Sequence, residues 1–342
     1  MTSSTTNRRG VVVVSGGTAG AGRAIVREFA SAGYDVAVLG RGRAGLDAAA
    51  AEVREKGQAA LAIKVDVSDA QAVMDAADRV EREIGPIDVW VNVAFVGALR
   101  YFWHTDPDLY RRITEVTYLG QVHGTMAALA KMRERDAGSI VQVGSALAYR
   151  GIPLQAAYCG AKHAIVGFTE SVIAELKHER SRIHVGMVQL PGMNTPQFDW
   201  NDNEFDQPPM PVAPIFQPEL AGRAVRYVAE HRRRNMWVGV STAYTILGNR
   251  FAPRVLDWYL ARSGVSGQLS DQPATRRGAN AYEPQDEVRD AGAHGRFDDR
   301  AHARDPWSAA SMHPVAAASL AAVPLVLSCA ATGLRRRGRR RS

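Results

Sequence analysis

The sequence predicts an α/β fold built on a doubly wound parallel sheet, as a single domain with a C-terminal extension. Residues 11–14 are four consecutive valines, and a continuous β-branched run is typical of a strand buried on both faces of a parallel sheet. Apolar runs alternate with segments of helical periodicity, at regular spacing, from residue 11 to about residue 240. This alternation favours parallel strands that are covered by helices on both faces.

Each predicted element follows from its own pattern. The apolar runs predict strands at 11–14, 34–39, 59–65, 87–91, 139–143, 183–190 and 236–240. Helical spacing predicts helices at 23–32, 46–56, 69–83, about 106–133, across 158–162, and at 221–231 and 243–262. Pro253 is expected to break the last of these helices, because proline cannot continue a helix.

Length and charge limit the functional classes. A chain of 342 residues with 46% hydrophobic residues has ample material for a full core. Its net charge is +7, but six arginines between residues 335 and 341 supply six of these charges, which leaves +1 for the rest of the chain. Because no basic face recurs along the body of the chain, nucleic-acid binding is not expected.

The N-terminus and the cysteines indicate the compartment. The valine run that follows Arg8 and Arg9 is too short for the apolar core of a signal peptide. Cys159 and Cys329 lie far apart in the sequence, so a structural disulfide is not expected and a reducing compartment fits. We expect a cytoplasmic protein, with membrane association through the C-terminus as an open alternative.

A glycine-rich turn follows the first predicted strand. Gly16, Gly20 and Gly22 have the spacing G-x-x-x-G-x-G, between the valine run and the helix predicted at 23–32. Backbone N–H groups at a helix N-terminus can approach a pyrophosphate only where side chains are absent. The turn therefore predicts a dinucleotide site, although its spacing differs from G-x-G-x-x-G. A glycine turn without a ligand is the alternative.

The end of the second predicted strand bears on cofactor choice. An acidic residue there would accept a hydrogen bond from the ribose 2′-hydroxyl of NAD, whereas an arginine accommodates the 2′-phosphate of NADP. The chain has Gly40 and Arg41 at this point, with Arg43 close behind and no carboxylate before Asp47. NADP(H) is therefore favoured over NAD(H). Two solvated loop arginines are the alternative interpretation.

Asp66 and Val67 follow the third predicted strand. A carboxylate in this position lies in the crevice where such sheets bind ligands, and it could meet an adenine amino group. Asp66 or Ser68 could equally cap the helix predicted at 69–83. The sequence leaves both interpretations open.

Three polar residues follow the fifth predicted strand. Ser145 comes just after the run at 139–143, and Tyr158 and Lys162 lie four residues apart, on one face of a predicted helix. A phenol with a pKa of about 10 is a poor base at neutral pH, and a nearby ammonium favours the phenolate. Ser145 could then hold a carbonyl or alkoxide oxygen while Tyr158 exchanges a proton. Tyr-x-x-x-Lys often arises by chance, so its value as evidence for a catalytic site depends on the glycine turn upstream.

Together these motifs resemble the short-chain dehydrogenase/reductase family, whose members are NAD(P)(H)-dependent oxidoreductases with a single Rossmann domain. The resemblance covers residues 10 to about 262. It rests on SGGTAGAG (15–22), DV (66–67), VNVA (91–94), Ser145, YCGAK (158–162) and PGMNT (191–195), in the order and spacing of the family. The resemblance implies that Tyr158 is the acid/base, that Lys162 lowers its pKa and binds the nicotinamide ribose, and that Ser145 orients the substrate oxygen.

The resemblance also implies a set of cofactor contacts. With Arg41 added from the strand end, they are Ser15, Gly16, Gly20, Gly22, Arg41, Asp66, Val67, Asn92, Tyr158, Lys162, Pro191, Gly192 and Thr195. The glycines would hold the pyrophosphate and the segment at 191–195 the nicotinamide end.

Three residues depart from the family pattern. Phe95 follows Asn92-Val93-Ala94 where the family has a glycine, and this ring is expected to reshape the cofactor pocket. Ser15 keeps the hydroxyl of the usual threonine. Thr117 stands where the family has its fourth catalytic residue, an asparagine whose carbonyl holds a proton-relay water and whose side chain steadies a helix irregularity. A threonine keeps the carbonyl and can bond back to the preceding turn, so we expect a working relay.

Apolar residues near the strand ends are candidates for the substrate side. They are Phe95, Leu99, Tyr101, Phe102, Trp103, Leu147, Tyr149, Met193, Phe198 and Trp200. A mouth rich in rings favours an apolar alcohol or carbonyl substrate, although about half of these rings are expected in the core or at a subunit contact. The irregular stretch 191–218 has the length of a lid. In this family C-terminal elements often build subunit contacts, so a homo-oligomer is expected.

The C-terminal extension divides into three parts, after a catalytic domain at 10–262. Residues 263–313 are polar and poor in aliphatic side chains, which predicts a disordered linker. Residues 314–334 are apolar over about the length that a bilayer core needs, so they are a possible membrane anchor. An unstructured tail or a surface-lying helix is the alternative. Residues 335–342 form an arginine-rich tail.

The expected activity is hydride transfer between NADP(H) and an apolar carbonyl or alcohol compound, with Tyr158 as the acid/base. The alternative is an NADP(H)-binding scaffold or sensor with little catalysis, and it is motivated by Thr117 and Phe95. No metal site is expected, because His294 and His302 have no metal-ligand spacing.

Overall fold

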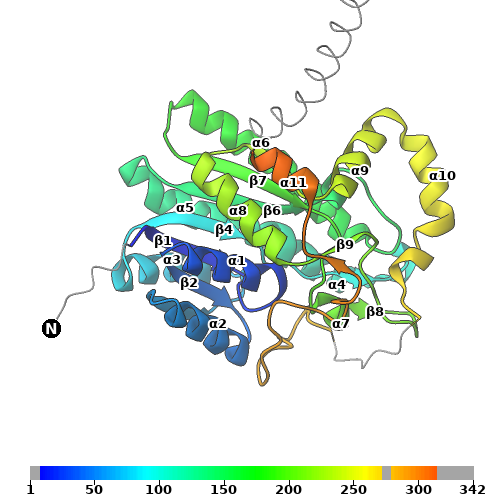
Figure 1. Ribbon diagram of the computed structural model, residues 1–342, viewed down its shortest axis with the longest axis horizontal. Coiled ribbons are helices and arrows are strands. Elements are labelled where there is room, and N and C mark those ends of the chain that lie inside the picture. The colour runs from blue at the N-terminus through cyan, green and yellow to red at the C-terminus, as the bar shows by residue number, and fades with distance from the viewer. Residues whose placement is uncertain (1–7, 272–278, 314–342) are drawn as a thin grey trace, which may run out of the picture.

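The computed structural model describes residues 8–271 and 279–313, and at its centre lies a seven-stranded sheet (Figure 1). Neighbouring strands are parallel throughout, in the order β10-β7-β6-β4-β1-β2-β3. The strands are β1 (Gly10–Ser15), β2 (Tyr34–Gly40), β3 (Ala60–Lys64), β4 (Ile87–Asn92), β6 (Ser139–Ser145), β7 (His184–Leu190) and β10 (Asn235–Trp237). The strand order reverses at β1, as in a doubly wound fold, so the predicted fold class is confirmed.

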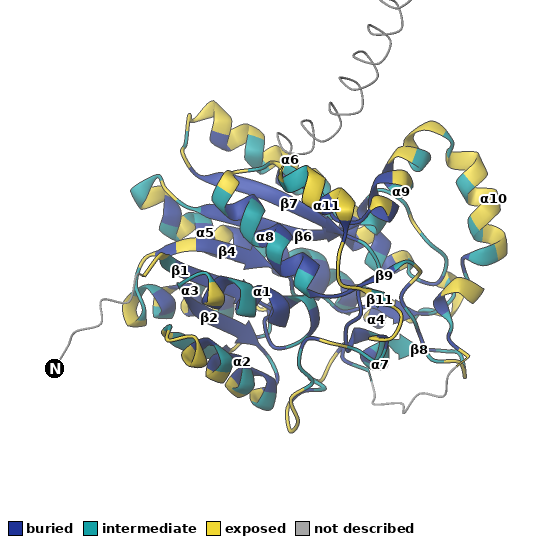
Figure 2. Cartoon of the chain, viewed as in Figure 1, coloured by how far each residue is buried: buried dark blue, intermediate teal, exposed yellow. Residues whose placement is uncertain are grey.

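Helices cover both faces of the sheet, whose inner strands are almost entirely buried (Figure 2). One layer contains α1 (Gly20–Ser31), α2 (Arg43–Glu55) and α8 (Glu219–His231). The other layer contains α3 (Ala70–Glu83), α5 (Gly120–Arg135) and α6 (Ala156–His178).

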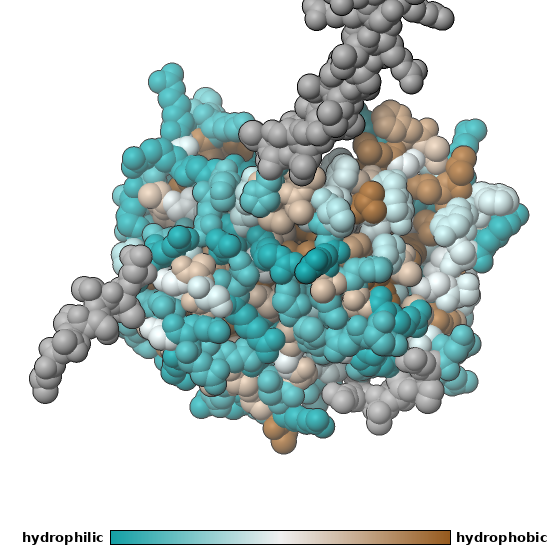
Figure 3. All heavy atoms as spheres, in the orientation of Figure 1, coloured by the Kyte–Doolittle hydropathy of each residue, from teal (hydrophilic) through white to brown (hydrophobic). Residues whose placement is uncertain are grey.

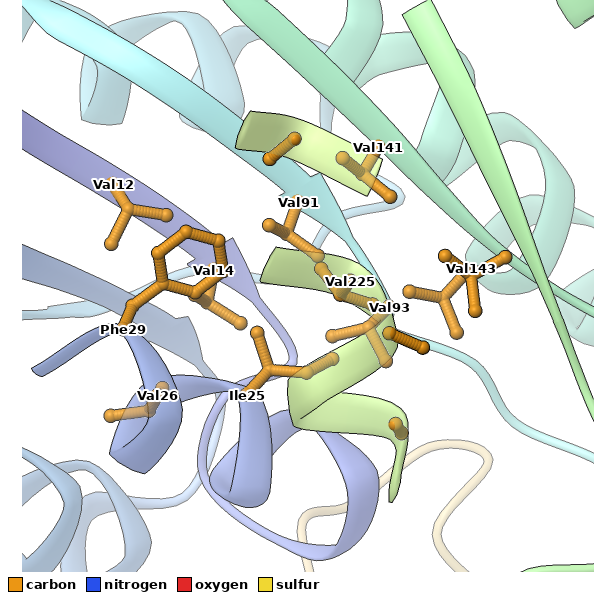
Figure 4. Close-up of a cluster of buried hydrophobic side chains, with 14 of the residues drawn as sticks. Val12, Val14, Ile25, Val26, Phe29, Val91, Val93, Val141, Val143 and Val225 are labelled. Carbon is orange, nitrogen blue, oxygen red and sulfur yellow. The ribbon is translucent and has the colours of Figure 1, made fainter. Parts of the chain in front are cut away.

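The valine run of β1 contributes to both apolar clusters. Val12 and Val14 face the α1 layer, where Ile25 and Phe29 meet them (Figure 4), while Val11 and Val13 of the run face the other layer. Successive side chains of a strand point to opposite faces, so a strand buried on both sides must be apolar at every position.

The long helix predicted at about 106–133 is divided into three parts. α4 (Pro107–Thr114) is followed by a π-helical turn at Glu115–Leu119, and α5 then continues. Asp106 begins α4 by accepting a hydrogen bond from the amide of Asp108. The prediction of one continuous helix was wrong, because apolar periodicity does not register a single π turn. Such turns are frequent at functional sites.

The helix predicted at 243–262 is broken at Pro253, as expected. α9 (Val240–Phe251) ends just before this residue and α10 (Pro253–Ser263) begins with it. α10 buries none of its residues, and hydrophobic side chains gather on the surface around these two helices (Figure 3).

The prediction that residues 263–313 form a disordered linker was wrong for the part that the structure describes. Residues 279–298, which we call the strap, run beside α2 and α7 (orange in Figure 1). The strap buries Ala281, Ala293 and Phe297. Many of its polar groups bond to partners on the sheet domain, so its composition alone underestimates its order.

Short elements complete the fold. They are β5 (Ala98–Leu99) paired with β8 (Asp202–Asn203), β9 (Ile215–Phe216) paired with β11 (Ala301–His302), and the helices α7 (Gln197–Trp200) and α11 (Pro306–Met312). Within residues 8–271 and 279–313, no helix has the length and apolar character to cross a bilayer. The possible anchor at 314–334 and the arginine-rich tail at 335–342 lie outside the described residues.

Candidate active site

A cavity of about 420 Å³ opens at the carboxyl ends of the sheet strands. The glycine turn between β1 and α1 lines one end, and Ser145, Tyr158 and Lys162 line the other. Doubly wound sheets bind their ligands at this edge, and the volume falls within the range of small-molecule sites.

Ser145 and Tyr158 meet at the inner end of this cavity. Ser145 is the last residue of β6, Tyr158 lies in the first turn of α6, and their side chains are hydrogen bonded. Ser145 Oγ also accepts a bond of 3.1 Å from the amide of Leu147. Burial raises the pKa of Tyr158, while the bond to Ser145 acts in the opposite direction. The phenol is therefore held protonated at neutral pH, with its oxygen beside the serine hydroxyl.

Lys162 lies one turn farther along α6 and is only 2% exposed. Its Nζ donates a hydrogen bond of 2.8 Å to the carbonyl of Val143, and burial lowers the pKa of the ammonium to about 7. Nζ lies 5.6 Å from the centroid of the Tyr158 ring. The expected lowering of the tyrosine pKa by Lys162 is not seen in this arrangement, because burial moves both pKa values toward the uncharged forms.

Phe95 is a neighbour of both groups. The centroid of its ring lies 5.6 Å from that of Tyr158 and 5.6 Å from Lys162 Nζ. The ring lines the cavity, at the position where the family has a small residue. It also shields the lysine and the tyrosine from water, which contributes to the burial that shifts their pKa values.

Thr117 lies within the π-helical turn and is completely buried. Its hydroxyl donates to the carbonyl of Val96 (2.9 Å) and accepts from the amide of the same residue (3.1 Å). The expectation that this hydroxyl bonds back to the preceding helical turn was wrong. It instead joins the helix irregularity to the segment that follows β4.

The glycine turn has a geometry that only glycine permits. The φ angles of Gly16 and Gly20 are +79° and +56°. A Cβ atom on Gly22 would lie 2.0 Å from the carbonyl oxygen of Gly16, and one on Gly16 would lie 2.6 Å from the Cα of Ala94. All three glycines line the cavity, so the backbone can be approached there, as a pyrophosphate requires.

Asp66 and Val67 line the cavity near the end of β3. Burial alone would raise the pKa of Asp66, but hydrogen bonds from Arg112 and Ser68 outweigh it and lower this pKa. The cap of α3 is provided by Asp69, which accepts from the amide of Ala72. Neither Asp66 nor Ser68 is thus needed as the cap, and the Asp66 carboxylate is held by an arginine instead.

Two of the predicted cofactor residues do not line the cavity. Asn92 is fully buried, where its Oδ1 accepts from Trp90 Nε1 and its Nδ2 donates to Gln142 Oε1. The hydroxyl of Ser15 donates to the carbonyl of Val91 over 3.3 Å. Both side chains support the strands beneath the cavity rather than the cavity wall.

The segment after β7 lies between the two ends of the cavity. Pro191, Gly192 and Thr195 all line it. A Cβ atom on Gly20 would lie 3.1 Å from the Cβ of Thr195, so this segment lies directly against the glycine turn.

About half of the candidate substrate-side residues reach the cavity. Those that line it are Phe95, Leu147, Met193, Phe198 and Trp200, whereas Leu99, Tyr101, Phe102, Trp103 and Tyr149 do not. The ring of Tyr101 instead stacks on Trp103, with a centroid distance of 4.9 Å. The wall is apolar in character near Ser145 and Tyr158.

The strap also lines the cavity, which the sequence pattern does not predict. Asn280, Pro284, Gln285 and Asp286 form the wall at the end where Arg41 lies. The Arg41 guanidinium donates to three successive strap carbonyls, at residues 280–282. Carbonyl groups exist at every position of a chain, so no sequence signal marks these as partners.

Comparison with known proteins agrees with this geometry. Residues 10–205 match the family model for short chain dehydrogenases, which ends well before the strap. The chain is 29% identical to "Uncharacterized oxidoreductase YxnA" of Bacillus subtilis, with 79% of this chain and 77% of that protein covered. It is 37% identical to "Inactive 2-(S)-hydroxypropyl-CoM dehydrogenase 2" of Xanthobacter autotrophicus, with 47% and 69% covered.

Solved structures show the same fold. One of them is an alcohol dehydrogenase from the archaeon Thermococcus sibiricus, complexed with 5-hydroxy-NADP. It superposes with a TM-score of 0.59 at 22% sequence identity, and the superposition covers 67% of this chain and 95% of that protein. The family match spans the strands, the glycine turn and the residues around Tyr158. The chain therefore belongs to the short-chain dehydrogenase family of oxidoreductases.

Proposed function

We propose that this protein is a nicotinamide-dependent oxidoreductase that interconverts an apolar carbonyl compound and its alcohol. The observation that carries the proposal is the cavity itself. It joins a glycine turn suited to a pyrophosphate with a hydrogen-bonded Ser145–Tyr158 pair and a buried Lys162. The bound dinucleotide would supply or accept the hydride at its nicotinamide ring.

The proposed roles follow from the positions of the three polar side chains. Ser145 Oγ orients the substrate oxygen, and the protonated phenol of Tyr158 donates its proton to that oxygen during reduction. Lys162 is fixed by the carbonyl of Val143 and would bind the nicotinamide ribose. The Thr117 hydroxyl serves only to position the helix irregularity, because it is bound to Val96, and the main-chain carbonyl of Thr117 would hold the relay water.

An apolar substrate is proposed from the character of the wall near Tyr158. Phe95, Leu147, Met193 and Trp200 all line the cavity, and they offer carbon surface to a ligand. Such a wall favours burial of apolar ligand surface over that of charged groups.

Two observations disagree on whether the protein prefers NADP(H) or NAD(H). Arg41 at the end of β2 supports the NADP(H) preference that the sequence predicts. Its hydrogen bonds to strap carbonyls count against that preference, because they occupy the donors that a 2′-phosphate would need. The proposed oxidoreductase activity does not depend on this choice.

Self-association is proposed from the surface of α9 and α10. Large hydrophobic side chains are exposed there, namely Val240, Tyr244, Leu247, Phe251, Val255, Trp258 and Tyr259. A contiguous apolar patch of this kind is typical of an interface, which supports the expected homo-oligomer. The cytoplasm remains the proposed compartment, in keeping with the unpaired, buried Cys159.

A binding protein with little catalysis is the second candidate. Phe95 beside Tyr158 and Lys162 favours it, because the ring occupies space next to the reacting groups. In that case the protein would bind a reduced dinucleotide but would not consume it with any member of a broad panel of aldehydes, ketones and alcohols.

The test is a substrate panel followed by nicotinamide absorbance, with the wild type beside Tyr158→Phe. We expect the variant to lose at least about a hundredfold in turnover while it still binds the dinucleotide, because only the exchangeable proton is removed. Tyr149→Phe is the matched control, since its half-buried hydroxyl contacts Gln189 and Asn235 outside the cavity. Undiminished turnover in the Tyr158 variant would refute the proposed acid/base.

A further inference from the structure

Asp286 of the strap carries a carboxylate that is buried against the N-terminal turn of α2. The residue is 4% exposed and lines the same cavity as the glycine turn. A Cβ atom on Gly42 would lie 1.8 Å from its Oδ1, and one on Gly45 would lie 2.2 Å from its Oδ2. Two glycines of the sheet domain thus leave the space that this side chain occupies.

The carboxylate of Asp286 is not fully satisfied. Within the part of the chain that the structure describes, its Oδ2 has no hydrogen-bond partner. A buried carboxylate oxygen without a donor is costly, so such an atom calls for an explanation. Asp286 lines the cavity, so a ligand hydroxyl there would provide the missing donor once the carboxylate rotates toward it.

The position of this carboxylate identifies the hydroxyl groups that fit. It lies beside the glycine-rich end of β2 and the start of α2, where Gly40 and Arg41 line the cavity. In dinucleotide-binding folds, an acidic residue in this region accepts a hydrogen bond from the ribose 2′-hydroxyl of NAD. Strand β2 supplies no such residue in this chain, and the strap brings one from 240 or more positions away in the sequence.

The backbone amides that begin α2 are already bound to the strap. The amide of Arg43 donates to the Glu287 carboxylate, that of Ala44 to the Glu287 carbonyl, and that of Gly45 to the Asp286 carbonyl. A helix N-terminus that is occupied in this way has no free amide in its first turn for a phosphate.

The basic side chains of this region are also engaged. Four of them pair with carboxylates: Arg41 and Arg112 with Asp66, Arg43 with Asp47, and Lys64 with Glu287. A 2′-phosphate would add a charge of about −1.5 to −2 next to Asp286. The local charge therefore opposes a phosphate and favours a neutral diol.

We infer that Asp286 makes this protein selective for NAD(H) over NADP(H), by accepting a hydrogen bond from the adenosine ribose and by repelling a 2′-phosphate. The inference rests on the proposed function, since it concerns the dinucleotide of the same site. It reverses the preference that Arg41 alone predicts, because the strap carbonyls bind that guanidinium.

The test is a pair of binding titrations on the full-length protein, with NADH and NADPH as the probes and nucleotide fluorescence as the signal. The wild type is expected to bind NADH at least about tenfold more tightly than NADPH, as one charge-assisted hydrogen bond can provide. Asp286→Asn should weaken NADH binding, strengthen NADPH binding and so remove most of that ratio. Asp290→Asn is the matched control, because this strap carboxylate pairs with Arg23 and does not line the cavity.

The outcomes distinguish failure of the inference from failure of the proposed function. Wild-type protein that binds NADPH as tightly as NADH overturns the inference, whether or not the variants fold. A ratio that Asp286→Asn leaves unchanged, or that Asp290→Asn changes equally, also overturns it. Failure of the wild type to bind either dinucleotide refutes the proposed function and the inference together.

Discussion

The sheet domain and the strap enclose the same cavity, but different forces hold them in place. The sheet domain is built on two large apolar clusters, one on each face of the sheet. The hydrophobic residues that the strap (279–298) buries are only Ala281, Ala293 and Phe297, and it is attached chiefly by polar contacts. At Asn194, for example, the side chain binds the amide of Phe297 and the carboxylate of Asp298.

The sheet domain and the strap are therefore ordered by different interactions. A segment that forms its own core is ordered by burial of apolar surface, which composition reports well. The strap is ordered by donors and acceptors that another part of the chain presents to it. A segment held in this way is expected to open locally, at a lower free energy than the sheet domain.

The largest predicted effect compares two buried phenylalanines, one from each part. Phe29 is 0% exposed in the cluster between β1 and α1, and Phe297 is 1% exposed in the strap. Phe29→Ala should lower the global free energy of unfolding by about 3 to 5 kcal/mol, because it leaves a cavity in the core. Phe297→Ala should lower the global value by about 1 kcal/mol or less, because the strap can detach on its own. Urea unfolding measures both.

Limited proteolysis distinguishes the two variants further. Cleavage within residues 279–298 should be faster in Phe297→Ala than in the wild type. If Phe297→Ala instead destabilises the whole protein as much as Phe29→Ala, the strap and the sheet domain form one cooperative unit and the comparison fails.

A smaller effect is predicted for the buried lysine of the sheet domain. The pKa of Lys162 is lowered by burial from 10.5 to about 7, so between these values the unfolded chain binds a proton that the folded chain does not. Wild-type stability should therefore rise with pH from about 7 to 10 through this group, whereas below about pH 7 its penalty is constant. Lys162→Met removes the penalty and should stabilise the protein by roughly 1 to 4 kcal/mol near pH 7.

The measurement is urea unfolding at several pH values between 7 and 9.5, a range that avoids ionisation of tyrosines in the unfolded chain. The stability difference between Lys162→Met and the wild type should shrink as the pH rises. Lys177→Met on the exposed face of the same helix should change stability by no more than about 0.5 kcal/mol. A difference that grows with pH would contradict the direction of the Lys162 shift.

Much of the fold could be predicted because its determinants are local. The valine run specifies a strand buried on both faces, the glycine spacing specifies a turn without side chains, and Pro253 cannot lie in the interior of a regular helix. The Ser145, Tyr158 and Lys162 positions follow similarly, because a strand end and one helical turn fix their relative placement.

The remaining features depend on partners that are distant in sequence. The π-helical turn around Thr117 is joined to Val96, and no periodicity of residues 107–135 indicates that contact. The predicted role of Arg41 in NADP(H) preference depended on which groups surround its guanidinium. These groups are carbonyls of strap residues, which lie beyond residue 279 in the sequence. A polar composition indicates that a segment lacks a hydrophobic core of its own. It does not indicate whether another part of the protein supplies hydrogen-bond partners for that segment.

The central claim is that the strap is part of the dinucleotide site, and amide hydrogen exchange of residues 279–298 tests it most directly. The amides of Gly295 and Phe297 donate to Asn194, so we expect them to exchange far more slowly than an unstructured chain. NADH should slow exchange further around Asp286 in the wild type, and less so in Asp286→Asn. Exchange at the unstructured rate, unchanged by NADH, would contradict the account.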